Sequence, residues 1–310
     1  MNMKVLLFTH KSDIDGLGAV VLSKLAFNNL TYELCEVYEI DERFSKCDKE
    51  NKLSVYDKIF ITDLCLNDDL ILKIHANEQL RNKVLIFDHH PKNKDYNYDW
   101  VTIKVKKEKG KCCGTSLFYE YLVNNKYLSS TASLNTFVEL TRQYDTWEWK
   151  DKYNNELANY LTVLMNIYQS EMYINEMTNK VINNNEFYFT DTELKLIMLE
   201  VQKVNLYVEK AIANMCIFPL DGNKVGIVFA ESYRNDIAEV LRNQNYDLDY
   251  VAIINFYRKT ISYRAIKEGF NVKEIAIKNG GGGHIAASSN YIPSHYQEKV
   301  IKLLLGDTKQ

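Results

Sequence analysis

The sequence lacks the features that define several common protein classes. No apolar run reaches the roughly 18 residues that a membrane-spanning helix needs, so we expect no membrane partner. Six cysteines are present, but none form a CxxC pair and no secretory leader pattern precedes them, which favours reduced thiols in the cytoplasm. The patterns GxxxxGK(S/T) and GxGxxG are both absent, so P-loop and dinucleotide-binding folds lose their usual support.

A strong charge of either sign is also missing. The formal net charge is −3, with no basic tail and no stripe of lysine and arginine. A protein that coats nucleic acid must neutralise many phosphates at once, so we expect no long duplex DNA as a partner. This balance leaves open a short anionic ligand that is held in one pocket.

The length of 310 residues is enough for about two domains. Apolar runs separated by stretches able to form helices predict an α/β fold, with a parallel sheet covered on both faces. The sequence pattern predicts helices from about residue 112 to 212, and a second α/β pattern follows. We expect strands at 3–10, 34–40, 56–64, 83–90, 100–106, 224–230, 250–257 and 260–266, and domains at 1–160 and 213–310 joined by a helical connector at 161–212.

Acidic and histidine side chains follow three of the predicted strands. Because loops leaving the carboxyl edge of a parallel sheet converge on one crevice, we expect these side chains to meet. Taken singly, each has an ordinary explanation, such as a helix N-cap for an aspartate or a packed core position for a histidine. The set is His10, Asp13 and Asp15 in THKSDIDG, Asp63 after IFIT, and Asp88, His89 and His90 in IFDHHP. A later helical stretch adds Asp145 in RQYDTW.

Together these residues indicate a metal site. Several carboxylates without neighbouring arginines would repel one another unless a cation neutralised them. Oxygen ligands with one or two imidazoles suit Mn²⁺ or Mg²⁺ better than structural zinc. The acids are numerous enough for two ions that share a bridging carboxylate, and such a pair, about 3.5–4 Å apart, clamps a phosphoryl group.

These motifs resemble those of the DHH phosphoesterase superfamily. HKSDIDG, TDL, FDHHP and QYDTW resemble its four ordered motifs, and NGGGGHIAASS at 279–289 resembles the glycine signature of its accessory DHHA1 domain. The resemblance implies an N-terminal parallel-sheet DHH domain and a smaller C-terminal α/β DHHA1 domain, with the active site in the cleft between them. The family motif usually ends in glycine where this chain has Ser289.

The resemblance also implies roles for single residues. It implies two Mn²⁺ ions, with Mg²⁺ or another divalent ion as a substitute. Either histidine of the pair fits the ligand role, and we assign it to His89. This leaves His90 to contact the scissile phosphate or a leaving oxygen, and Asp88 to orient the imidazoles. The implied ligands are His10, Asp13 and Asp63 for one ion and Asp15, Asp63, His89 and Asp145 for the other, with Asp63 bridging.

The glycine signature is expected to bind substrate phosphate at the start of a helix, since glycines let backbone amides approach closely. A flexible linker is the alternative for the glycines. Arg264, on a strand of the second domain, is expected to contact the same phosphate, with an outward-facing strand arginine as the alternative. The expected substrate-binding residues are Gly281, Gly282, Gly283, His284 and Arg264.

Within the superfamily, the DHHA1 signature combined with a short chain is typical of stand-alone nanoRNase-type oligoribonucleases. The motifs of this sequence resemble those of the B type more than those of the A type. We therefore expect a metal-dependent phosphodiesterase that hydrolyses short oligoribonucleotides or linear dinucleotides to mononucleotides. The alternatives are a soluble cyclic-dinucleotide or phosphoadenosine-phosphate phosphodiesterase, and a non-catalytic nucleotide-binding module. The sequence does not determine whether the protein forms a homodimer, which substrate length it prefers, or whether it acts on RNA or DNA.

Overall fold

The computed structural model describes residues 3–91, 96–108 and 110–306. The chain forms two compact units, Met1–Ile197 and Met198–Gln310. Among the described residues, no helix is long and apolar enough to cross a membrane. The mixed α/β fold class predicted from the sequence is confirmed.

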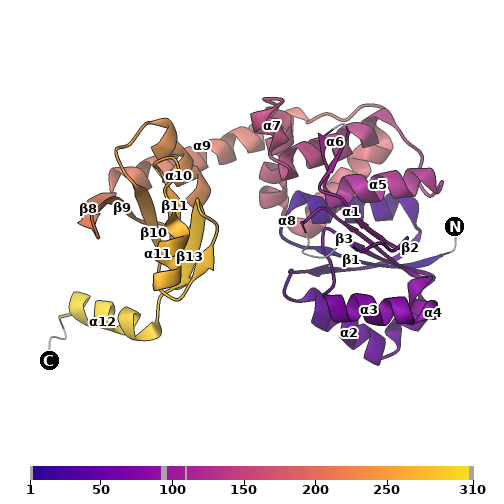
Figure 1. Ribbon diagram of the computed structural model, residues 1–310. Helices are drawn as coiled ribbons and strands as arrows, with labels where there is room; N and C mark the ends of the chain where they lie inside the picture. The colour runs from indigo at the N-terminus through magenta and orange to yellow at the C-terminus, as the bar shows by residue number, and fades with distance from the viewer. Residues whose placement is uncertain (1–2, 92–95, 109, 307–310) are drawn as a thin grey trace. The chain divides into compact units, whose positions relative to one another are not determined.

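A five-stranded sheet lies at the centre of the first unit (Figure 1), in the order β2-β1-β3-β4-β5 with every neighbouring pair parallel. The predicted parallel sheet is therefore confirmed, although the strand expected at 34–40 is wrong. Strand β2 is an edge strand with half-exposed residues, so its sequence NLTYELC contains no continuous apolar run. The strands are β1 (Lys4–His10), β2 (Asn29–Cys35), β3 (Lys58–Thr62), β4 (Val84–Asp88) and β5 (Val101–Ile103).

Both faces of this sheet are buried. Along β1, Val5 and Leu7 pack on one face, and Leu6 and Phe8 pack on the other, as the two-residue period of a strand requires. One core is completed by helices α1 (Ile14–Ala26), α5 (Gly114–Asn124), α6 (Ala132–Asp145) and α8 (Glu156–Asn183), and the other by α2 (Ile40–Lys49), η1 (Lys52–Val55), α3 (Asp68–Ala76) and α4 (Glu78–Arg81).

The stretch 161–212, expected as a connector, contains most of α8 and α9 (Asp191–Ala213). Leu161 and Tyr173 of α8 are fully buried in the core of the first unit, and α8 is broken at Gln169, where φ is 61°. The division between the two units falls within α9. The remaining elements of the first unit are α7 (Glu148–Asp151) and a short hairpin of β6 (Lys106–Lys107) and β7 (Gly110–Lys111).

A six-stranded mixed sheet forms the second unit, in the order β12-β13-β11-β10-β9-β8, with only β9 and β10 parallel. Helices α9 and α10 pack on one face and α11 packs on the other. The strands predicted here are confirmed. The elements are β8 (Cys216–Leu220), β9 (Asn223–Phe229), α10 (Arg234–Asn243), β10 (Tyr250–Asn255), β11 (Thr260–Ala265), α11 (Val272–Lys278), β12 (Gly282–Gly283), β13 (Ala287–Tyr291) and α12 (Ser294–Leu304).

Candidate metal centre

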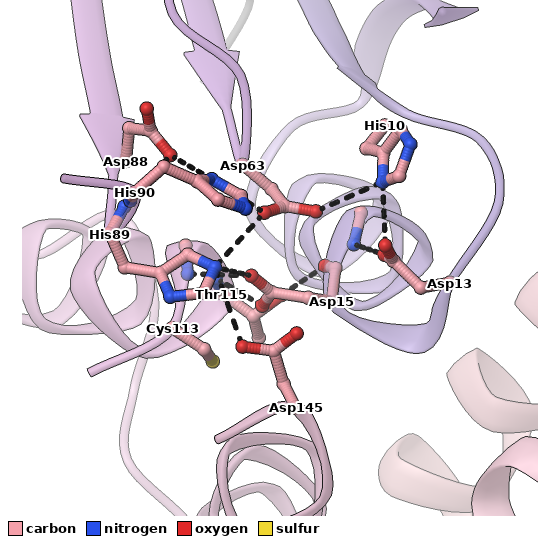
Figure 2. Close-up of polar contacts among 12 residues, drawn as sticks. His10, Asp13, Asp15, Asp63, Asp88, His89, His90, Cys113, Thr115 and Asp145 are labelled. Atoms are coloured by element: carbon pink, nitrogen blue, oxygen red, sulfur yellow. Dashed lines mark hydrogen bonds and ion pairs between the residues drawn. The ribbon is translucent and has the colours of Figure 1, made fainter. Parts of the chain in front are cut away.

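The carboxyl edge of the parallel sheet carries the predicted acids and histidines (Figure 2). His10 is the last residue of β1, and Asp63 and His89 follow directly after β3 and β4. Asp15 lies in the first turn of α1, and Asp145 is the last residue of α6. The expectation that chain segments far apart in sequence bring these side chains together is met.

Asp63 lies between two histidines. Its Oδ2 is 3.5 Å from His10 Nδ1, and its Oδ1 is 3.3 Å from His89 Nε2. The backbone of Asp63 is left-handed, with φ of 55°, a conformation that aspartate and asparagine tolerate better than most residues. The carboxylate is therefore held with one oxygen toward each histidine.

Two clusters of potential ligand atoms meet at Asp63. His10, Asp13 and Asp63 form one, and Asp63, His89 and His90 form another, with the ligand atoms of each within 4.8 Å of one another. A third cluster, Asp15, Cys113 and Asp145, adjoins them because His89 Nε2 is 3.4 Å from Asp145 Oδ2 and 3.9 Å from Asp15 Oδ2.

Asp13 has two roles at once. Its Oδ1 accepts a hydrogen bond from the amide of Gly16 at 2.9 Å, so it is the N-cap of α1. Its Oδ2 lies 2.5 Å from His10 Nδ1. The ordinary explanation of this residue as a helix cap is correct, but the second oxygen still faces the cluster.

The buried atoms of the centre fit a divalent cation. Within the described part of the chain, Asp63 Oδ2, His89 Nε2 and Asp145 Oδ2 are buried and make no hydrogen bond. Buried polar atoms without partners cost roughly 1–3 kcal/mol each, so such a group indicates an ion that would satisfy them. A donor set of carboxylate oxygens and imidazole nitrogens matches the chemistry of Mn²⁺ or Mg²⁺.

The N-terminus of α5 fixes the orientation of Asp15. The amides of Gly114 and Thr115 donate to the two oxygens of this fully buried carboxylate at 2.6 and 2.7 Å, and Thr115 Oγ1 donates to its backbone carbonyl. Gly114 allows this because a Cβ there would lie 2.7 Å from the Asp63 amide nitrogen. From the sequence, CCGTS at 112–116 resembles a small-residue loop that related proteins have near the site, but it predicts no role for Gly114 or Thr115.

Asp88 organises the histidine pair. Its Oδ1 accepts hydrogen bonds from the backbone amides of His89 and His90, at 2.8 and 3.2 Å. The same oxygen lies 2.8 Å from His90 Nδ1. His90 is 55% exposed, whereas His89 is only 16% exposed and faces Asp63 and Asp145. The two rings therefore point to different surroundings.

The crowded acids shift the protonation of the centre. Burial, followed by the charge of Asp15, raises the pKa of Asp145 to about 9 and also raises that of Asp63. The hydrogen bond with Asp13, followed by the Asp63 carboxylate 3.5 Å away, raises the pKa of His10 to about 11. Without a cation, the folded protein thus holds protons that the unfolded chain releases near pH 4 for aspartate and about 6.5 for histidine.

This protonation predicts how pH and metal affect stability. Because the folded state binds more protons, the stability of the metal-free protein falls as the pH rises from about 6.5 to 9. A bound divalent ion would replace those protons, so we expect the increase in Tm on adding Mg²⁺ to grow over this range. Thermal melts in EDTA and in Mg²⁺ measure it, and Asp145→Asn should flatten the profile in EDTA. A metal-free Tm that rises with pH would contradict the assignment.

Among the predicted residues of the second unit, Arg264 lies on β11, and Gly282 and Gly283 lie on β12, the two strands that flank β13. Arg264 of β11 donates through Nε to Asn235 at 3.0 Å, and burial with nearby Arg234 and Arg242 lowers its pKa. Gly282 and Gly283 form β12, which pairs with Ser289 and Ser288 of β13.

The helix expected after the glycines is wrong. His284 and Ala287 exchange backbone hydrogen bonds of 2.8 and 3.2 Å, so the chain turns and returns as β13. The glycines are required by this hairpin, because a Cβ on Gly281 would lie 2.1 Å from the Ser289 carbonyl oxygen and Gly283 has φ of 137°. Pairing with β13, which itself pairs with β11, therefore determines the local structure.

Comparison with known proteins agrees with this geometry. A profile of the DHH family, N-terminal domain, matches residues 4–163. Oligoribonuclease NrnB of Bacillus subtilis is 33% identical over 297 residues, which are 94% of this chain and 74% of that protein.

Two solved structures share the fold. The pGpG-specific phosphodiesterase PggH from Vibrio cholerae aligns with a TM-score of 0.57 over 98% of both chains, at 15% identity. Exonuclease RecJ bound to manganese aligns with a TM-score of 0.56 over 95% of this chain and 87% of its own, at 13% identity. The chain belongs to the DHH family, and it is a hydrolase, a phosphodiesterase of the DHH type.

Proposed function

We propose that this protein hydrolyses short oligoribonucleotides or linear dinucleotides to mononucleotides, with two divalent cations, Mn²⁺ by preference, at the carboxyl edge of its parallel sheet. The observation that carries this proposal is Asp63, whose two oxygens face His10 and His89 beside buried atoms that make no hydrogen bond. The similarity to oligoribonuclease NrnB, and the shared fold of a phosphodiesterase that acts on the linear dinucleotide pGpG, support the substrate class.

We assign the cation ligands as the family resemblance implies, which leaves His90 and Cys113 of the clusters outside both sets. His10, Asp13 and Asp63 hold one cation, and Asp15, Asp63, His89 and Asp145 hold the other. Such a pair of ions supplies positive charge to the phosphoryl group and lowers the pKa of water. The protein orients these ligands through the amides of α5 on Asp15 and the N-cap bond on Asp13.

His90 is assigned the proton transfer to the leaving oxygen. The hydrogen bond to Asp88 outweighs burial and raises the pKa of His90, which keeps its ring protonated further into the neutral range. Since Nδ1 contacts Asp88, Nε2 is the atom that remains for the substrate. Asp88 thus positions His90 and favours its charged form.

We assign the region 213–310 to substrate binding, as a DHHA1-type domain. A Cβ on Gly282 would have no heavy atom within 4 Å, and the nearby His284 is exposed. Arg264 and Arg234 supply positive charge on β11 and at the start of α10. Glycine amides and guanidinium groups are the usual partners of phosphate oxygens.

Direct assay tests the proposal. Purified protein with Mn²⁺ should convert a 5′-labelled RNA dinucleotide and pGpG to mononucleotides, and EDTA should stop the reaction. Parallel arms with a cyclic dinucleotide and with phosphoadenosine phosphate identify the alternative substrates. Release of mononucleotides from these alone would overturn the dinucleotide assignment. Binding of nucleotides without hydrolysis of any substrate would instead indicate a binding module.

A further inference from the structure

A lysine-rich hairpin lies beside the candidate metal centre. The segment KVKKEKGK at 104–111 contains five lysines and one glutamate, in a chain whose net charge is −3. Of these residues the structure describes all except Lys109. The sequence pattern as a whole shows no basic stripe, so this short run stands out only once its position is known.

Both ends of the hairpin are attached to elements of the metal centre. Ile103 of β5 pairs with Asp88, and the amide of Lys104 donates to the Asp88 carbonyl at 3.0 Å. The other end leads into Cys113, the N-cap of α5, whose first amides hold Asp15. The hairpin therefore begins at the same carboxyl edge of the sheet as the acids.

The lysines of the hairpin differ in their partners. Lys107 pairs with Glu120, and Lys111 Nζ donates to the Thr146 carbonyl at 3.0 Å. Lys104 and Lys106 are exposed, and their ammonium groups make no hydrogen bond or ion pair within the described residues. They line an open hollow of about 850 Å³ whose other lining residues are Ile103, Val105, Lys107, Glu108 and Glu120.

The hairpin also places like charges together. Lys106 of β6 lies directly opposite Lys111 of β7. Like charges opposite each other destabilise a strand pair, and a bound anion relieves this repulsion. In the lining of the hollow, Glu108 and the paired Glu120 only partly offset Lys104, Lys106 and Lys107. On the Lys111 side, Glu148 Oε1 lies 3.5 Å from the Lys111 amide nitrogen.

We propose that Lys104 and Lys106 bind a backbone phosphate of the substrate strand outside the bond that is cleaved. This inference rests on the proposed function, because it assigns the hairpin to the part of an oligoribonucleotide that extends beyond the metal centre. A dinucleotide without a terminal phosphate has only the scissile phosphate, so it has none for the hairpin. The hairpin thus favours strands longer than two nucleotides.

The test compares Lys104→Ser/Lys106→Ser with Lys46→Ser/Lys49→Ser. The control removes the same charge from exposed lysines in the last turn of α2. Binding of a labelled five-nucleotide RNA is measured by fluorescence anisotropy in EDTA at low salt, where screening is weak. The hairpin variant should raise Kd about tenfold and lower the salt slope of log Kd by about 0.7 for each lost phosphate contact. The control should match the wild type.

Catalysis gives a second readout. With Mn²⁺, the hairpin variant should lower the ratio of kcat/KM for the five-nucleotide strand to that for the dinucleotide, and the control should preserve it. The inference would be overturned if the hairpin variant bound RNA with the Kd of the wild type, or if the control variant lost as much affinity as the hairpin variant. It would also be overturned if the wild type did not bind the RNA. If the wild type cleaves neither RNA, the proposed function fails, and anisotropy still decides the role of the hairpin.

Discussion

Asp63→Asn is expected to reduce hydrolysis by about a thousandfold or more while leaving the fold intact. Removing the charge shared by both clusters weakens both cation sites, and metal charge stabilisation is worth several kcal/mol, at about 1.4 kcal/mol for each tenfold in rate. Asparagine tolerates the left-handed backbone at this position. Because burial and Asp15 raise the pKa of Asp63, its ionised form destabilises the metal-free fold. The variant should therefore melt no lower than the wild type in EDTA at pH 8.

The matched control for this variant is Asp57→Asn. Asp57 precedes the same strand, β3, at its other end, and its Oδ2 accepts a hydrogen bond from the Lys4 amide at 2.7 Å. The asparagine oxygen can accept the same bond. Calorimetric titration with Mn²⁺ and kcat/KM on the dinucleotide should separate the two variants. Activity of Asp63→Asn within tenfold of the wild type would refute a bridging role.

Gly114→Ala is expected to lower kcat about a hundredfold and the free energy of unfolding by about 1–3 kcal/mol. The new Cβ would lie 2.7 Å from the Asp63 nitrogen and 2.9 Å from its Cα, and backbone atoms cannot move aside as a flexible side chain does. The start of α5 must shift, which moves both the amides on Asp15 and the carboxylate of Asp63. Misplacement by about 1 Å can cost a factor of 10² in rate.

Ser116→Ala separates this positioning effect from a general weakening of α5. Ser116 and Cys113 form the capping box of the helix, so its loss should cost about 1 kcal/mol of stability. It leaves the amides of Gly114 and Thr115 in place, and kcat should stay within a few-fold of the wild type. Chemical denaturation and steady-state kinetics measure both. Gly114→Ala with lowered stability but normal kcat would show that α5 only packs against the centre.

Much of the first unit could be predicted because its inner strands are buried on both faces. The runs ending at His10, Asp63 and Asp88 are continuous and apolar, and parallel pairing brings their ends to one edge. The edge strand β2 escaped prediction because most residues of NLTYELC are half-exposed, so the strand contains no continuous apolar run. Local sequence carries the strand signal only where the environment is uniform.

Contacts between distant segments explain what the sequence could not show. The bonds from Gly114 and Thr115 to Asp15 join residues about a hundred positions apart. The spacing of adjacent histidines does not show which of them is the ligand. Their surroundings differ because His89 faces Asp63 and Asp145, which come from other segments, whereas His90 contacts Asp88. The glycine run forms a hairpin because of its pairing partner β13, which local propensity does not reveal.

Strand β8 has a consequence for the behaviour of the protein at high concentration. It is the last strand of the six-stranded sheet, and its residues, among them Ile217, Phe218 and Leu220, are exposed. An apolar edge of this kind invites strand addition and aggregation. Pro219 has no amide hydrogen, so the outer rim of β8 lacks one donor for an incoming chain. Pro219 therefore disfavours the addition of further strands at this edge.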